Sequence, residues 1–167
     1  MGIKDHPLHP LFVAELVAAG LFAWTLFEYA MHRYLFHWDC ERPAVKWFVY
    51  LIHGNHHTNP NDPMRGLMPL AVSVPVGGLI WLAFLALMGA DGTWLFLGFM
   101  TGYVCYDTVH FACHQWTMHS RVGKMFKRHH MRHHCVNENA NFAISALFWD
   151  RVFGSRIRSL KRNGIQE

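Results

Sequence analysis

The feature that most constrains the fold is a 24-residue apolar stretch, residues 67–90, that contains no charged side chain. Two further apolar stretches lie at 11–31 and 93–106. About 20 apolar residues suffice to cross a bilayer as a helix, and buried helices of a soluble protein rarely lack charge over such a length. We therefore predict an all-α integral membrane protein with about three transmembrane helices. The predicted spans are residues 10–32, 67–89 and 93–114.

Lys and Arg are distributed very unevenly along the chain. Fourteen of the fifteen lie in 33–65 or 121–162, and the short connection 89–93 has none. Because positive residues favour the cytosolic side, we expect these segments to form a cytosolic cap on a cytoplasmic or endoplasmic reticulum membrane. The net charge of +4 suits a cap near anionic lipid, and we expect no nucleic-acid partner. The predicted cap comprises residues 33–66 and 115–167 of a single membrane-embedded domain, 1–167.

Ten of the fourteen histidines fall into four tight clusters, each at the end of an apolar stretch. Offsets of three and four residues place side chains on one face of a helix. The first cluster has an offset of five, which leaves its imidazoles roughly 140° apart on a regular helix, so that pair requires a bent helix end. The clusters are His32 and His37; His53, His56 and His57; His110 and His114; and His130, His133 and His134.

Ten imidazoles exceed the four ligands of a structural zinc site or the three of a catalytic one. Divided over two ions they give about five each. Imidazole suits iron, zinc, copper and nickel alike, so the residues alone do not select the metal. The pattern predicts a dimetal site held in the cap.

Carboxylates near these clusters are candidates to orient an imidazole N–H. Asp107 lies three residues before His110 and is the first candidate. Glu28 lies one turn before His32 and is the second, unless it is only a helix-end partner for Arg33. The four histidines outside the clusters are expected to be interfacial or solvent-facing: His6, His9, His119 and His129.

The order of the four clusters resembles that of the integral-membrane fatty acid hydroxylase/sterol desaturase superfamily. Three further stretches resemble its fatty acid 2-hydroxylase branch, and the likeness runs from about residue 25 to residue 155. These stretches are 62–69 (DPMRGLMP), 102–107 (GYVCYD) and 149–154 (WDRVFG).

The resemblance implies a dinuclear metal centre that activates O₂ with two reducing equivalents and inserts one oxygen atom into a lipid C–H bond. The ten clustered histidines are the implied ligands, with iron the catalytic metal and zinc able to replace it in purified protein. Some relatives carry a fused cytochrome b5 domain, for which we find no sign in this sequence, so the electrons are expected from a separate cytochrome b5- or ferredoxin-like partner. Acyl hydroxylases often have four spans, whereas three are clear in this sequence.

The position of the clusters bears on the substrate. Metals just beyond the cytosolic helix ends would meet the polar end of a membrane lipid, so oxidation should fall close to that end, as at C2 of an acyl chain. Four aromatic residues could line the acyl path: Phe27, Trp81, Phe99 and Phe111.

Two alternatives stay open at this point. A carotenoid ring hydroxylase shares the histidine order in a similarly short chain, although the 62–69 and 149–154 stretches favour acyl lipids. A non-catalytic membrane metal- or haem-binding protein is the other alternative, and it would need fewer histidines.

Overall fold

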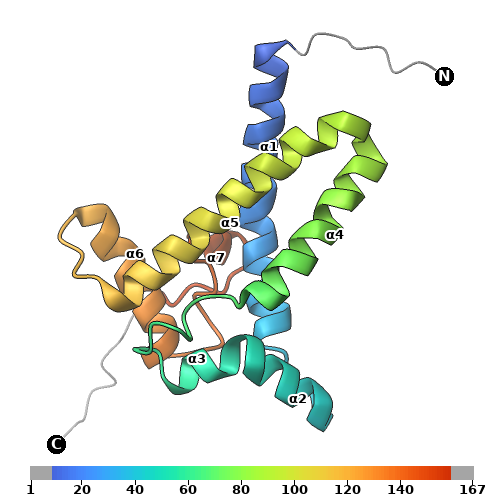
Figure 1. Ribbon diagram of the computed structural model, residues 1–167. Helices are drawn as coiled ribbons and strands as arrows, with labels where there is room; N and C mark the ends of the chain where they lie inside the picture. Colours follow the sequence, from blue (N-terminus) through green and yellow to red (C-terminus); the bar gives the residue numbers. More distant parts are fainter. Residues whose placement is uncertain (1–8, 159–167) are drawn as a thin grey trace, which may run out of the picture.

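The computed structural model describes residues 9–158, and this part of the chain is helical with no strand (Figure 1). The predicted all-α class is therefore confirmed. The α-helices are α1 Pro10–Ala30, α2 Pro43–Val49, α3 Asn55–Thr58, α4 Leu70–Met88, α5 Gly92–Gln115, α6 Arg121–Cys135 and α7 Trp149–Val152. Two π-helices, η1 Met31–Phe36 and η2 Tyr50–Gly54, and one 3₁₀ turn, η3 Gly89–Asp91, complete the set.

Two stretches are long and apolar enough to cross a membrane, Pro10–Phe36 and Leu70–Gln115. The second is 46 residues long and reverses direction at η3, where Gly89 adopts a φ of 63° that favours glycine. The α4–α5 pair is therefore a hairpin beside α1 (Figure 1). Three long apolar helices thus stand close to the three predicted ranges. Their crossing of a bilayer remains a prediction.

The closest packing in the molecule joins α1 to α5. A Cβ at Gly20 would collide with the backbone carbonyl of Leu95, and one at Gly98 would collide with that of Val17. Small residues let two membrane helices approach closely, as they do here. Toward the cap the interface becomes aromatic, with Trp24 and Phe99 rings 5.0 Å apart.

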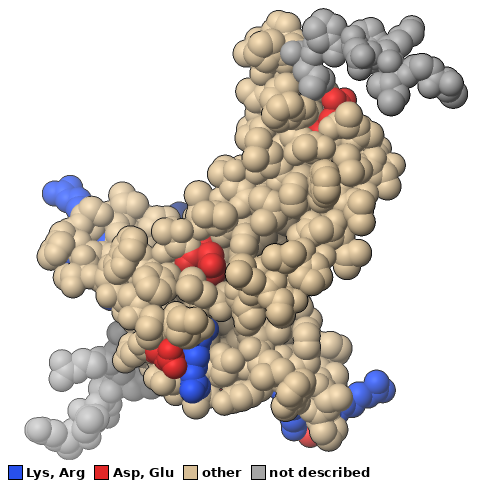
Figure 2. All heavy atoms as spheres, in the orientation of Figure 1, with Lys and Arg blue, Asp and Glu red and all other residues tan. Residues whose placement is uncertain are grey.

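The remaining faces of the long helices are apolar and exposed. Among α4 residues only Gly77 is buried, and Leu79 and Leu87 are 68% and 80% exposed. Figure 2 shows the α4–α5 hairpin nearly free of Lys and Arg, while those in view lie around α2, α3 and α6. Such a surface is suited to lipid contact.

The cap lies at the C-terminal end of α1. Residues 44–53 lie in α2 and η2, and the basic segment 121–134 lies in α6, which is capped by the Ser120 side chain. In the 148–153 segment, Trp149 is buried against α1 and donates a 3.1 Å hydrogen bond to Thr25.

Candidate metal centre

The structure brings all ten clustered histidines together at one end of the long helices, in two groups of five. Within each group the ligand atoms lie within 4.8 Å of one another. The first group is His32, His37, His53, His57 and His133. The second group is His56, His110, His114, His130 and His134.

A π-helix solves the awkward spacing of the first cluster. In η1 the hydrogen bonds run from residue i to i+5, so five residues make about one turn. His32 and His37 therefore face the same side, and their Nε2 atoms are 3.3 Å apart. The bent helix end that the spacing required is this widened turn. A second one, η2, carries His53.

The two HxxHH stretches divide their histidines between the groups. His53 and His57, four residues apart, join the first group, while His56 joins the second. In α6, His130 and His134 join the second group and His133 joins the first. A separation of four residues leaves two side chains about 40° apart on a helix, whereas three residues turn the other way by about 60°. Each HxxHH stretch therefore supplies ligands to both groups.

Backbone carbonyls orient three of the imidazoles. Nδ1 of His32 lies 2.5 Å from the Phe142 carbonyl oxygen, and Nδ1 of His133 lies 2.8 Å from that of Ala140. Nδ1 of His110 lies 2.9 Å from the oxygen of Gly66. A carbonyl only accepts, so each Nδ1 must carry the proton and each Nε2 must present a bare lone pair to its group.

These lone pairs fit a bound cation. The Nε2 of His32 is 3.1 Å from that of His53 in the first group, and the Nε2 of His110 is 3.0 Å from that of His56 in the second. Two nitrogens at right angles around an ion, each at about 2.1 Å, lie about 3.0 Å apart. Packed lone pairs at this spacing repel unless a positive ion stands between them. The donor set and its spacing therefore suit a metal ion in each group.

Burial keeps these imidazoles neutral. It lowers the pKa of His133 to about 4 and, together with its His133 neighbour, the pKa of His57 to about 3. Burial and the surrounding imidazoles also hold the pKa values of His53 and His130 well below their usual range. A neutral imidazole is the form that binds a metal, so the cap keeps the ligands ready to coordinate.

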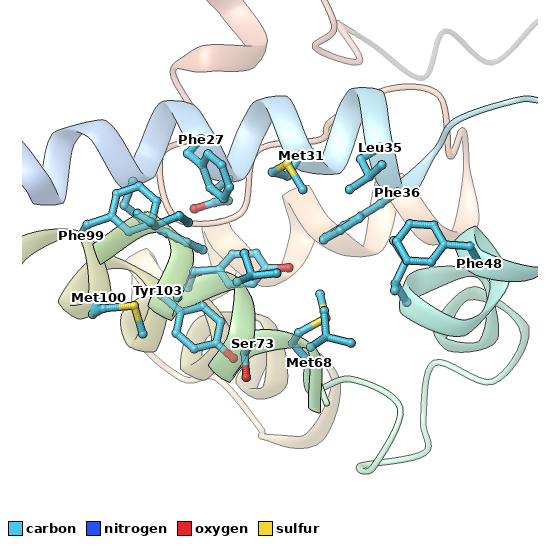
Figure 3. A pocket seen from close by; sticks show the side chains of 18 residues that line it. Phe27, Met31, Leu35, Phe36, Phe48, Met68, Ser73, Phe99, Met100 and Tyr103 are labelled. Carbon is cyan, nitrogen blue, oxygen red and sulfur yellow. The ribbon is translucent and has the colours of Figure 1, made fainter. Parts of the chain in front are cut away.

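An apolar cavity of about 150 Å³ lies between the long helices, near their cap end. Figure 3 shows side chains from α1, η1, α2, α4 and α5 facing it. A small second cavity adjoins His53 and His110. Four residues line both cavities, so the apolar space leads toward both histidine groups: Phe36, Ile52, Met68 and Tyr106.

Of the four residues predicted to line the acyl path, two line the apolar cavity and two do not. Phe27 and Phe99 line the apolar cavity. Trp81 does not, because it lies on the outer face of α4 with 40% exposure and packs against Phe96. Phe111 lines a separate, open cavity on the other side of α5.

Known proteins resemble this chain both in sequence and in fold. The family model described as fatty acid hydroxylase matches residues 17–155. The chain belongs to the fatty acid hydroxylase family. A solved structure of full-length scs7p, in which only the hydroxylase domain is visible, matches with a TM-score of 0.84 and 34% identity, covering 90% of this chain and 58% of that one.

Curated relatives in this family are longer than the chain. A ceramide very long chain fatty acid hydroxylase of Saccharomyces cerevisiae is 35% identical over 93% of this chain and 41% of its own length. A dihydroceramide fatty acyl 2-hydroxylase of Arabidopsis thaliana is 34% identical over 86% and 61%. The fatty acid 2-hydroxylase of Homo sapiens is 34% identical over 83% and 38%. The chain thus spans about two fifths to three fifths of the relatives it matches.

In this family member the predicted carboxylates take other positions. The Asp107 carboxyl group lies at the backbone of Met68, and the Nδ1 of His110 is bound to Gly66 instead. Glu28 contacts neither an imidazole nor Arg33. It accepts hydrogen bonds from the backbone N–H groups of Ile144 and Ser145, at 2.7 and 2.9 Å.

Asp150 is a carboxylate that supports the first group, and the spacing along the helices did not predict it. It is fully buried and accepts hydrogen bonds from the backbone N–H groups of Phe142 and Ala143, at 2.9 and 3.0 Å. The carbonyl of Phe142 in turn orients His32. The signal was the WDRVFG stretch, which carried the family resemblance and contains Asp150.

The prediction that His129 faces solvent was also wrong. The His129 side chain is only 10% exposed and its Nε2 lies 2.8 Å from the Asp150 carboxylate. The same carboxylate that holds the 142–143 backbone therefore also holds α6. Burial alone would raise the pKa of Asp150, but His129 and its other hydrogen-bond donors lower it below its ordinary value.

Proposed function

We propose that this family member is a membrane lipid hydroxylase that inserts one oxygen atom of O₂ into a C–H bond near the polar end of an acyl chain. The observation that carries the proposal is the meeting of two five-histidine groups with an apolar cavity. The activities for which the relatives are named, fatty acid 2-hydroxylation and ceramide fatty acid hydroxylation, support the substrate class.

The ten histidines would hold two ions, one in each group. Iron is the metal that suits the reaction, and it would supply the activation of O₂ with two reducing equivalents. The chain keeps its imidazoles neutral through burial and fixes three of them through backbone carbonyls. The reducing equivalents would come from a separate cytochrome b5- or ferredoxin-like protein.

The apolar cavity would hold a section of the acyl chain and exclude water from it. Phe27 and Phe99 form part of its wall, while Phe36 and Tyr106 stand where it approaches the histidines. An acyl chain lying along the cavity would place its polar end at the cap. A C–H bond near that end, as at C2, would then be the one nearest the two groups.

The domain, the three spans and the cytosolic orientation belong to the same proposal. Residues 33–65 and 121–162 carry fourteen of the fifteen Lys and Arg residues, and the histidines lie in or beside these segments. The positive-inside rule therefore supports a centre on the cytosolic face of the membrane.

Lipid mass spectrometry of cells that express the chain under ¹⁸O₂ tests the proposal. We expect acyl lipids that carry one ¹⁸O atom, and none with the variant His133→Ala. The matched control is His119→Ala, which changes a histidine outside both groups and should retain the product. Label on carotenoids would instead indicate the ring hydroxylase, and metal bound without any labelled product would indicate a non-catalytic binding protein.

A further inference from the structure

A second cavity, of about 440 Å³, lies on the side of α6 away from the histidine groups. It separates α6 from the segment that follows the 140–145 loop. Five arginines line it: Arg121, Arg128, Arg132, Arg151 and Arg156. The apolar part of its wall comes from Met125, Leu147, Phe148 and Ile157. We call this space the arginine pocket.

The positive charge of the arginine pocket is uncompensated. Within residues 9–158, none of its five guanidinium groups lies within ion-pair distance of a carboxylate. The carboxylate next to it, Asp150, is fully buried and already accepts from His129, Ser155 and two backbone N–H groups. Five guanidinium groups around one concavity without a counter-charge create a positive potential that attracts an anion.

The arginine pocket also lies at the membrane side of the histidines. Its residues Phe148 and Arg151 flank Trp149, whose ring packs 5.9 Å from that of Phe22 on α1. Thr25, which also contacts Trp149, precedes His32 by seven residues, about 10 Å along a helix. Apolar side chains stay exposed beside the arginines, with Phe148 42% and Val152 62% exposed. A cationic pocket with an apolar rim at this depth suits a membrane interface.

We infer that the arginine pocket binds the phosphate-bearing headgroup of an anionic membrane lipid. Guanidinium groups bind phosphate oxygens through paired, charge-assisted hydrogen bonds, and basic pockets at the cytoplasmic membrane face are suited to anionic lipids. The volume falls in the range of small-molecule sites. A docking protein would instead need a face of about 800 Å². This inference rests on the membrane orientation in the proposed function but not on the hydroxylase activity.

The test uses the full chain in neutral detergent, presented with equal amounts of phosphatidylglycerol and phosphatidylcholine. Native mass spectrometry measures which lipid stays bound, and thermal unfolding measures stabilisation by each. We expect phosphatidylglycerol to be retained preferentially and to raise the unfolding temperature. The double variant Arg128→Gln/Arg151→Gln should weaken phosphatidylglycerol binding by about tenfold or more, because each guanidinium supplies charge-assisted hydrogen bonds.

The matched control is Arg42→Gln/Lys124→Gln, which removes the same charge from exposed positions outside the arginine pocket. Equal loss of lipid in both variants would overturn the inference, because it would indicate diffuse attraction. Competition by inorganic phosphate at the same concentration would also overturn it, in favour of a soluble anion. So would binding of an acidic electron-transfer protein, but not of lipid, that the double variant abolishes. Arg151→Lys keeps the charge and loses the fork, so a severalfold loss in this milder variant tests the inference even if the double variant unfolds.

Discussion

The two histidine groups contain the same ligands in the same number, but they are supported very differently. In the first group, the Phe142 and Ala140 carbonyls orient His32 and His133, and the Glu138 carboxylate lies 3.7 Å from Nδ1 of His57. In the second group, His110 alone has such a contact within residues 9–158, to Gly66.

The buried Nδ1 atoms of His56 and His130 contact no acceptor among the described residues. Groups behind a metal ligand fix its orientation and raise its basicity, and their loss typically lowers metal affinity by about 10–100-fold. The comparison therefore teaches that two sites with equal ligands need not hold their ions equally. We expect the first group to bind its ion more tightly than the second.

The largest expected effect follows removal of a ligand from the better supported group. His133→Ala should weaken the binding of the first ion and abolish hydroxylation, because the group loses one of its five imidazoles and the Ala140 carbonyl loses its partner. Metal analysis of anaerobically purified protein would show the bound metal falling by about half. The His119→Ala control should keep the full content, and an unchanged content in His133→Ala would remove that residue from the ligand set.

A change behind the ligands should separate the groups without touching an imidazole of either. Asp150→Asn weakens the hold on the 142–143 backbone that orients His32, so the first group should lose about 10–100-fold in metal affinity. The second group should lose less, because Asp150 reaches it only through His129 on α6. Competition with a chelator measures both affinities. Asp107→Asn is the matched control, because that carboxyl group lies at the Met68 backbone and not at an imidazole. Equal losses in the two variants would contradict the assigned roles.

Acid should destabilise the metal-free chain through the same imidazoles. The pKa values of His133 and His57, 6.5 when unperturbed, lie at about 4 and 3 in the fold. As pH falls below 6.5 the unfolded chain binds these protons first, so the stability present above pH 6.5 is lost progressively toward pH 4. Thermal unfolding followed by circular dichroism between pH 7.5 and about 4.5 measures the effect. An unfolding temperature that does not change over this range would contradict the prediction.

The smallest expected effect would repair the weaker group. A Cβ at Gly66 would lie 3.9 Å from Nδ1 of His56, an ordinary contact, so the hydroxyl in Gly66→Ser can reach this unpartnered N–H. The second group should then bind metal up to about tenfold more tightly. Gly66→Ala, which adds the Cβ without an acceptor, should show no gain. A similar gain in both variants would mean that packing, not the hydrogen bond, is responsible.

Much of this centre could be predicted from the sequence. Long uncharged stretches predicted the helices, and helical spacing selected all ten histidines that the structure gathers. The division into groups was not predicted, because offsets of three and four were treated as one helix face. In the structure four-residue pairs such as His53 and His57 stay together, while His56 turns to the other group. Contacts between residues that are far apart in the sequence determine that arrangement.

The supporting shell was the harder part. Asp107 was selected because it shares a helix with His110, and register is all that a sequence offers for a near neighbour. Asp150 lies outside the helices that carry the ligands. It acts through a loop that contacts α1, which lies more than a hundred residues earlier in the sequence. Only the tertiary fold brings such groups together. The π-helix at His32 was foreseen as a distortion but not as a widened turn.

The most direct test of the central claim is an anomalous difference map from crystals of anaerobically prepared, iron-loaded protein. The account predicts two strong peaks, one within about 2.0–2.2 Å of the five Nε2 atoms of each group, with the peak of the first group the fuller at limiting iron. A single peak shared by all ten histidines, or iron bound elsewhere with both groups unoccupied, would contradict it.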